Sequence, residues 1–212
     1  MIVAEIVGIV ILLVGALLFG LGAQSVIRAT NRRAFKLDVA PAKGSAAKGI
    51  AYSFTLGMMP WAKESTRRHL VAYTRGIVFH VAVFGAFALL LVSPWIRQWH
   101  ETIRFVAASG LALGALAALG GYWIRASDEA VRAVSTPDDY FSLGLVTAFI
   151  ASAALACVVE PAIPGLWAIS GIVIAYIPIS KLKHSIYFFY TRTLFGAFFG
   201  YRGVLKISRR SS

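Results

Sequence analysis

The sequence predicts an all-α integral membrane protein with five transmembrane helices. Of its 212 residues, 58% are hydrophobic and only 14% are charged, and the mean hydropathy is +0.74. Soluble domains carry about 25% charged residues. A helix needs about 20 apolar residues to cross a bilayer. The chain therefore has room for five or six spans and for no large soluble domain.

Five apolar segments account for these spans. They are expected at residues 3–25, 75–96, 103–124, 141–159 and 164–190, and the second helix is expected to begin earlier, near Glu64. The first segment is predicted to be a retained span, because no basic residue precedes it and no small-residue cleavage pattern follows. We interpret residues 1–212 as a single transmembrane domain with a basic connection at 26–70 and a basic tail at 191–212.

The basic residues predict the orientation of the spans. Eighteen of the 21 Lys and Arg residues fall on one side, in the connection 26–70, the turn 125–140 and the C-terminal stretch. The positive-inside rule places that side in the cytoplasm and the N-terminus outside. Topology thus explains the formal charge of +12, and no nucleic-acid partner is expected.

Two histidines, His80 and His184, lie within apolar segments, in the half of the bilayer predicted to face the cytoplasm. An ionisable side chain in a membrane is costly and usually has a partner. Two imidazoles from different helices can hold an iron porphyrin between them. Gly76 and Gly85 could make room for a flat macrocycle, although ordinary helix packing explains them equally well. Cations at the inner edge could neutralise the propionates, although topology alone also accounts for them: Arg75, Lys181 and Lys183.

The number of histidines limits the site to one haem. His69 precedes His80 by eleven residues, which on a helix returns to within about 20° of the same face, about 16 Å away. The fifth span, however, offers only His184 as a second ligand. His69 is flanked by charges and is expected at the interface, yet depth alone does not exclude it as the ligand in place of His80. His100 falls in the opposite turn.

The single cysteine, Cys157, excludes an internal disulfide and a cysteine-held iron–sulfur cluster. We expect it to be a small apolar residue in a helix. Any cluster that the protein uses must come from a partner.

Two stretches resemble the gamma subunit of respiratory nitrate reductase and the membrane cytochrome subunits of heterodisulfide-reductase-like complexes. GIVFHVAVFGAF, around His80, is similar to the haem-binding segment of the second helix. YIPISKLKHSIYFFYTR, around His184, is similar to the Pro-x-[Ser/Thr]-[Arg/Lys]-Leu-x-His segment near the end of the fifth helix. Five spans with an outer N-terminus and an inner C-terminus also match.

The resemblance implies one haem b, held by His80 and His184 near the cytoplasmic side. The nitrate reductase members hold two haems, but here Leu90 and the region of Leu166 lack the histidines of the outer pair. It also implies a multi-pass subunit in the inner membrane of a prokaryote. Family members draw electrons from quinol and pass them to an iron–sulfur subunit on the cytoplasmic face.

We therefore predict a membrane cytochrome b subunit that transfers electrons between the quinone pool and a partner iron–sulfur or cytochrome subunit. Bis-histidine ligation leaves no open iron position, which favours electron transfer over catalysis at the metal. A quinone needs a proton donor or acceptor close to a hydrogen-bond donor. With Arg75, the candidate groups at the inner edge are Glu64, Arg68, His69 and Asp128. The alternative is a haem-free membrane anchor or assembly subunit in which the histidines pack.

Overall fold

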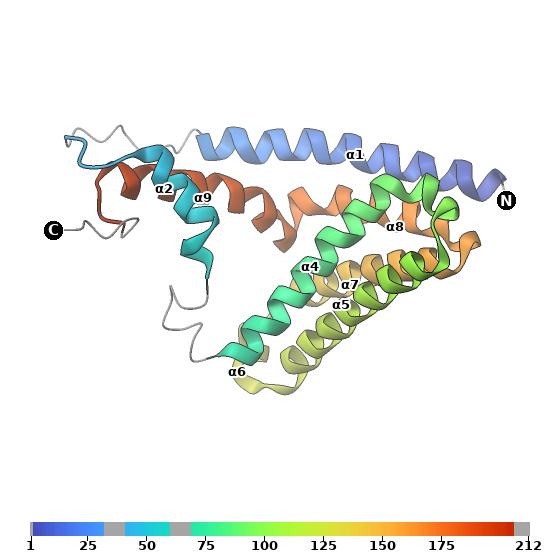
Figure 1. Ribbon diagram of the computed structural model, residues 1–212. Helices are drawn as coiled ribbons and strands as arrows, with labels where there is room; N and C mark the ends of the chain where they lie inside the picture. The colour runs from blue at the N-terminus through green and yellow to red at the C-terminus, as the bar shows by residue number, and fades with distance from the viewer. Residues whose placement is uncertain (1, 32–40, 60–68, 206–212) are drawn as a thin grey trace. The chain divides into compact units, whose positions relative to one another are not determined.

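The computed structural model describes residues 2–31, 41–59 and 69–205, and all regular structure in these residues is helical. Five of the helices are long and apolar enough to cross a membrane, as predicted (Figure 1). These candidate spans cover Ile2–Thr30, Leu70–Gln98, Glu101–Ser127, Pro137–Val158 and Glu160–Ile179.

The α-helices are α1 (Ile2–Asn31), α2 (Ala46–Phe54), α4 (Leu70–Val92), α5 (Glu101–Ser127), α6 (Glu129–Ala133), α7 (Pro137–Val158), α8 (Ile163–Tyr176) and α9 (His184–Tyr201). Short 3-10 helices at Leu56–Met58, Ser93–Gln98, Glu160–Ala162, Ile177–Ile179 and Lys181–Lys183 extend or separate them.

The chain forms two compact units. We call Met1–Gln24 with Val71–Leu182 the bundle unit, and Ser25–Leu70 with Lys183–Ser212 the basic unit. The bundle unit carries nearly all of the five candidate spans. The interpretation of residues 1–212 as one functional domain stays a prediction.

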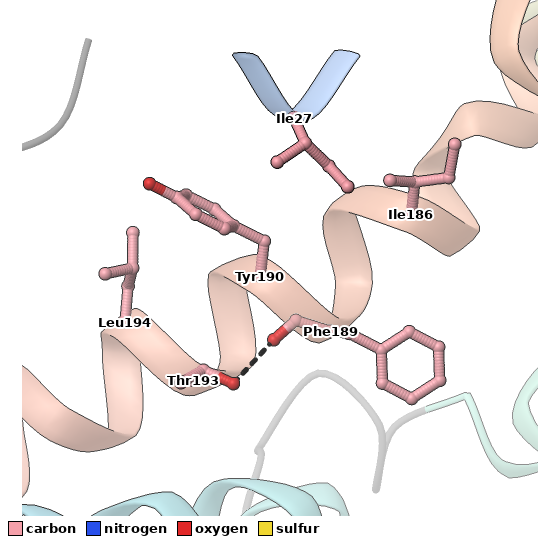
Figure 2. A pocket seen from close by; sticks show the side chains of 6 residues that line it. All are labelled: Ile27, Ile186, Phe189, Tyr190, Thr193 and Leu194. Carbon is pink, nitrogen blue, oxygen red and sulfur yellow. Dashed lines mark hydrogen bonds between the residues drawn. The ribbon is translucent and has the colours of Figure 1, made fainter. Parts of the chain in front are cut away.

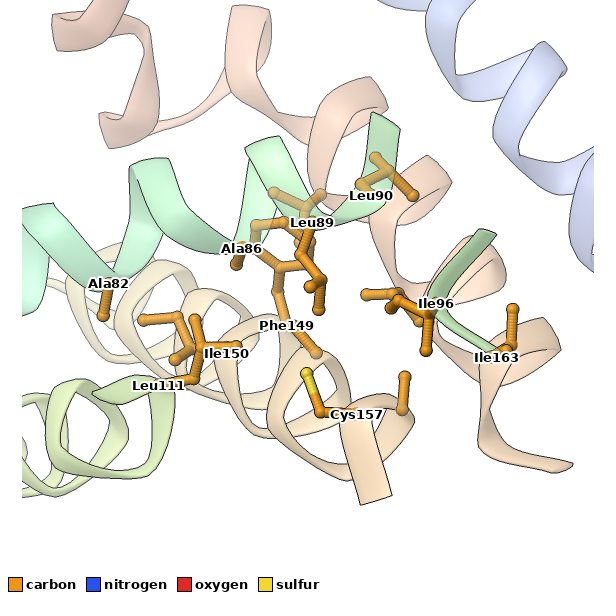
Figure 3. Packing of buried hydrophobic residues seen from close by; sticks show 14 of the residues in the cluster. Ala82, Ala86, Leu89, Leu90, Ile96, Leu111, Phe149, Ile150, Cys157 and Ile163 are labelled. Carbon is orange, nitrogen blue, oxygen red and sulfur yellow. The ribbon is translucent and has the colours of Figure 1, made fainter. Parts of the chain in front are cut away.

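The core of the bundle unit is built where α4, α5, α7 and α8 meet (Figure 3). Phe149, Ile150 and Cys157 of α7 are fully buried, as are Ile96 and Leu166. Cys157 is a free cysteine, as expected for a small apolar residue in a helix. Apolar side chains fill the inside of the bundle and also cover its outside, which is the distribution a lipid-facing helix bundle requires.

A seam of small residues joins α1 to α8 in the bundle unit. A Cβ added to Gly15 would stand 2.1 Å from the carbonyl oxygen of Gly171, and one added to Gly8 would stand 2.6 Å from that of Pro164. One heptad further, Gly22 faces Pro178. The pairs advance together along both helices, so α1 and α8 run parallel. Small residues let backbones approach closely where apolar burial provides no driving force between helices.

The basic unit is organised around α2 and α9, which lie side by side (Figure 1). Gly49 of α2 packs against the backbone of Gly196 and Gly200 of α9. The buried hydroxyl of Ser53 lies 2.8 Å from the carbonyl oxygen of Arg192. Because Gly49 meets Gly196 and Gly200 while Ser53 meets Arg192, the two helices run antiparallel.

The predicted fifth span is wrong at its C-terminal end. It was expected to continue to residue 190, but the span ends at Ile179. Pro178 lacks an N–H and cannot continue a helical hydrogen-bond ladder. The backbone turns extended at Ser180 (φ −111°, ψ −175°), and α9 then begins anew at His184. The second helix also differs from expectation, because it begins at Leu70 after a turn at His69; Glu64 lies outside the described residues.

Candidate functional site

His80 lies in the middle of α4 and presents its ring on the surface of the bundle unit. Its Nδ1 is 2.7 Å from the carbonyl oxygen of Gly76, one turn earlier. A carbonyl oxygen only accepts, so Nδ1 is the donor of this hydrogen bond. Metal-binding histidines show this arrangement, with one ring nitrogen donating to a carbonyl and the other directed to the metal.

The helix face beside His80 is open at Gly76. A Cβ added to Gly76 would meet no atom within 4 Å, whereas one added to Gly85 would contact the Leu111 side chain at 3.7 Å. Gly85 is exposed and borders the Leu111 side chain of α5. Gly76 leaves bare backbone one turn from the imidazole, where a flat group could approach.

The Arg75 side chain extends toward α5. It passes the backbone of α5 at Gly120 and Gly121. Five residues along a helix correspond to a rotation of about 140°, so Arg75 and His80 occupy different faces of α4. The role of Arg75 as a propionate partner stays a prediction.

His184 is the first residue of α9 and belongs to the basic unit. It was expected inside the fifth membrane span, but the fifth candidate span ends before it, at Ile179. Its side chain is exposed. His80 therefore belongs to the bundle unit and His184 to the basic unit.

Of the residues predicted for a quinone site, Glu64 and Arg68 lie outside the described residues. His69 lies in an exposed turn rather than on the face of α4 that carries His80. The Asp128 side chain accepts the backbone N–H of Val131 at 3.0 Å and caps α6. This capping role explains Asp128 without a ligand.

A polar cluster at one end of the bundle unit was not predicted. The Asp138 carboxylate accepts hydrogen bonds from the Tyr176 hydroxyl and from the backbone N–H of Lys181, the latter at 2.7 Å. The Lys181 ammonium lies 3.6 Å from Asp139. The sequence carried one signal for part of this cluster: Thr136 and Asp139 have the spacing of a capping box, and the Thr136 hydroxyl and backbone N–H both donate to Asp139.

This cluster gives Lys181 contacts that differ from the predicted contact with a haem propionate. The residue was predicted to face a haem propionate, but its ammonium is already paired with an acid and its backbone N–H is held by Asp138. Its observed contacts tie the segment after Pro178 to the start of α7. Lys183 ends the 3-10 helix that directly precedes His184.

The opposite end of the bundle unit carries a second set of ion pairs. Arg97 lies 3.6 Å from Glu5 and 3.7 Å from Glu160, and Arg104 lies 3.5 Å from Glu160. The Arg104 guanidinium also donates to the carbonyl oxygen of Cys157 at 2.6 Å. These contacts join α1, α5, α7 and the segment after α4.

Among the described residues, no three His, Cys, Asp or Glu side chains gather as a bare metal-ion site requires; a bis-histidine haem needs only two ligands. No protein-family model, curated protein or solved structure matches this chain.

Proposed function

We propose that this chain is the haem b-containing membrane subunit of a respiratory oxidoreductase complex. In this proposal it lies in the inner membrane of a prokaryote, with its N-terminus outside and its C-terminus in the cytoplasm. It exchanges electrons between the quinone pool and a partner iron–sulfur or cytochrome subunit. The resemblance to the gamma subunit of nitrate reductase remains part of the proposal.

The observation that carries the proposal is the environment of His80. The imidazole lies on an outward surface of a helix apolar enough to span a membrane, next to the exposed side chains of Ile77 and Val81. Such a polar ring is costly in hydrocarbon unless it has a partner. The Nδ1 atom donates to the Gly76 carbonyl oxygen, as it does in many metal-binding histidines, so Nε2 is the nitrogen that would bind the iron. A metal ligand fits this chemistry better than a packing residue would.

We assign the second axial position to His184, which follows the Pro-x-Ser-Lys-Leu-x-His pattern of residues 178–184. Lys183, which directly precedes His184, is the cation proposed for a propionate, since Lys181 is paired with Asp139 and Arg75 lies on another face of α4. A bis-histidine haem, when bound, carries one electron and has no open iron position. The residues of the chain would hold the ring, orient it and keep water from it.

The quinone is the mobile substrate of this proposal. The groups proposed near its binding site are Glu64, Arg68 and His69, since Asp128 is already engaged as a helix cap. The predicted cytoplasmic side is strongly basic and complements an acidic partner subunit. The charge distribution supports the orientation, because the basic unit holds fifteen of the 21 Lys and Arg residues.

A reduced-minus-oxidised absorption spectrum of the purified full chain tests the proposal. We expect a b-type band with one haem iron per chain. His80→Ala and His184→Ala should each abolish the band, because each removes an axial ligand. His69→Ala should keep it, because His69 lies in a turn outside α4.

Three outcomes would contradict parts of this assignment. Absence of a b-type band from the wild-type chain refutes the cytochrome and leaves the haem-free anchor or assembly subunit. Loss of haem in His69→Ala, together with retention of haem in His80→Ala, would show that His69 and not His80 is the ligand from the second span. Two haem irons per chain refute the limit set by the number of histidines.

A further inference from the structure

Charge is divided unequally between the two units. Residues 25–70 and 183–212, which form the basic unit, hold fifteen of the 21 Lys and Arg residues but only two of the nine Asp and Glu residues. The bundle unit holds six basic and seven acidic residues and is close to neutral. The formal charge of +12 is therefore a property of the basic unit.

The described part of the basic unit contains no acidic side chain to balance this charge. Its two acidic residues, Asp38 and Glu64, lie outside the described residues. Lys43 and Lys48 are exposed at the start of α2, and Arg202 is exposed just after α9. Because α2 and α9 run antiparallel, these bases gather at one end of the pair, where the backbone N–H of Lys43 donates to the carbonyl oxygen of Tyr201.

The helix α9 combines this charge with exposed aromatic rings. Eight of its 18 residues are aromatic, against 13% of the whole chain. Phe195 and Phe198 are each 43% exposed and Phe189 is 59% exposed. Yet α9 is not one of the five helices apolar enough to span. Aromatic rings are side chains that settle at the boundary between hydrocarbon and headgroups, and the bases near both ends of the α2–α9 pair would meet anionic headgroups there.

Arginines lie against these rings. The Arg202 guanidinium lies over the Phe198 ring at 4.5 Å, and that of Arg192 lies over Phe188 at 5.6 Å. Pairing a cation with an aromatic face lets both remain at a boundary between water and hydrocarbon.

An apolar groove runs along the same helix (Figure 2). It has a volume of about 350 Å³ and is lined by Ile27, Ile186, Phe189, Tyr190, Thr193 and Leu194. The lining is almost entirely hydrocarbon, since the Thr193 hydroxyl is bonded to the carbonyl oxygen of Phe189 at 2.8 Å. Arg28 directly follows Ile27 in the chain. The groove thus suits an acyl chain whose charged end lies among bases.

We propose that the basic unit is a membrane-interface module that binds anionic phospholipid, with the headgroup phosphate at the bases of α2 and α9 and an acyl chain along the groove of α9. This binding does not depend on the haem, so a haem-free protein would retain it.

Hydrogen–deuterium exchange of the full chain in lipid nanodiscs tests the proposal. One set of nanodiscs contains phosphatidylcholine alone, and the other contains phosphatidylcholine with phosphatidylglycerol. We expect α9 peptides to exchange more slowly in the anionic nanodiscs, and high salt to remove the difference, since salt screens surface charge. Lys48→Gln and Arg202→Gln should each weaken the protection by up to about fivefold, as one base at a membrane surface contributes about 1 kcal/mol.

The matched control is Arg132→Gln, which removes one exposed base from α6 in the bundle unit. It should leave the protection of α9 unchanged. Equal exchange in the two lipids, or equal losses in the control and in both test variants, would overturn the proposal. The proposal would also be overturned, in favour of a protein partner, if the exchange rate of α9 peptides were the same in both lipids but fell when an acidic polypeptide was added. Lys48 makes no ring contact, so its variant keeps the test valid if Arg202→Gln misfolds.

Discussion

Gly15 of α1 and Gly171 of α8 meet backbone to backbone, so closely that neither position has room for a side chain. A Cβ on Gly15 would stand 2.1 Å from the Gly171 carbonyl oxygen, and a Cβ on Gly171 would stand 2.3 Å from that of Ile11. No real contact of a Cβ is that short, so any substitution there must push the helices apart.

The first prediction is that Gly15→Leu destabilises the bundle unit. Overpacking of this kind costs on the order of 1–3 kcal/mol, and here the obstacle is backbone that cannot rotate away. The thermal unfolding midpoint of the full chain in detergent should fall clearly. Gly20→Leu is the matched control, because it adds the same side chain to the same helix where nothing lies within 4 Å. Equal midpoints for the two variants would mean that the seam does not form.

The second prediction concerns Ser53, whose side chain is fully buried between α2 and α9. Ser53→Ala removes a hydroxyl that lies 2.8 Å from the carbonyl oxygens of both Ile50 and Arg192 and should cost about 1 kcal/mol. We expect faster limited proteolysis of the α2 segment in the folded protein. Thr191→Ala serves as the control, because its exposed hydroxyl bonds within α9 to Tyr187. Resistance of Ser53→Ala equal to that of the control would show that the buried bond adds nothing.

The third prediction concerns Asp138, which holds the chain just after Pro178. Asp138→Ala leaves the Tyr176 hydroxyl and the Lys181 N–H without their acceptor. Because His184 begins three residues after Lys181, the variant should lower both the thermal midpoint and the haem content of purified protein. Asp128→Ala removes only the cap of the short helix α6 and should change both less. An unchanged haem content in Asp138→Ala would show that the contact between Asp138 and Lys181 does not help to position His184.

The fourth prediction separates two arginines at the other end of the bundle unit. The Arg104 side chain is 16% exposed and bonds the Cys157 carbonyl oxygen, whereas that of Arg97 is 42% exposed and makes only long ion pairs. Arg104→Gln should cost on the order of 1–3 kcal/mol, because a buried carbonyl loses a charged donor. Arg97→Gln should change stability by less than about 1 kcal/mol, as exposed ion pairs usually do. Chemical denaturation in mild detergent measures both, and a reversed order would contradict this account.

Composition and hydropathy were sufficient to predict an all-helical protein with five spans, because membrane-crossing helices need long apolar segments that stand out in one dimension. The seam of Gly8, Gly15 and Gly22 was not predicted, although these glycines recur every seven residues in the sequence. The spacing of glycines shows that another helix can approach closely, but it does not show which helix does so.

The candidate site could be predicted only in part. The sequence by itself determined which histidines lie in or near apolar segments, and the single histidine of the fifth segment limits the proposed haem to one. Only the tertiary structure decided that His80 donates through Nδ1 to Gly76, that Lys181 is held by Asp138 and Asp139, and that His184 starts a separate helix in the basic unit. The reason is physical: hydropathy is a sum over neighbouring residues, whereas the direction of an imidazole depends on its hydrogen bond, and the contacts of Lys181 depend on Asp138 and Asp139, more than 40 residues earlier in the chain.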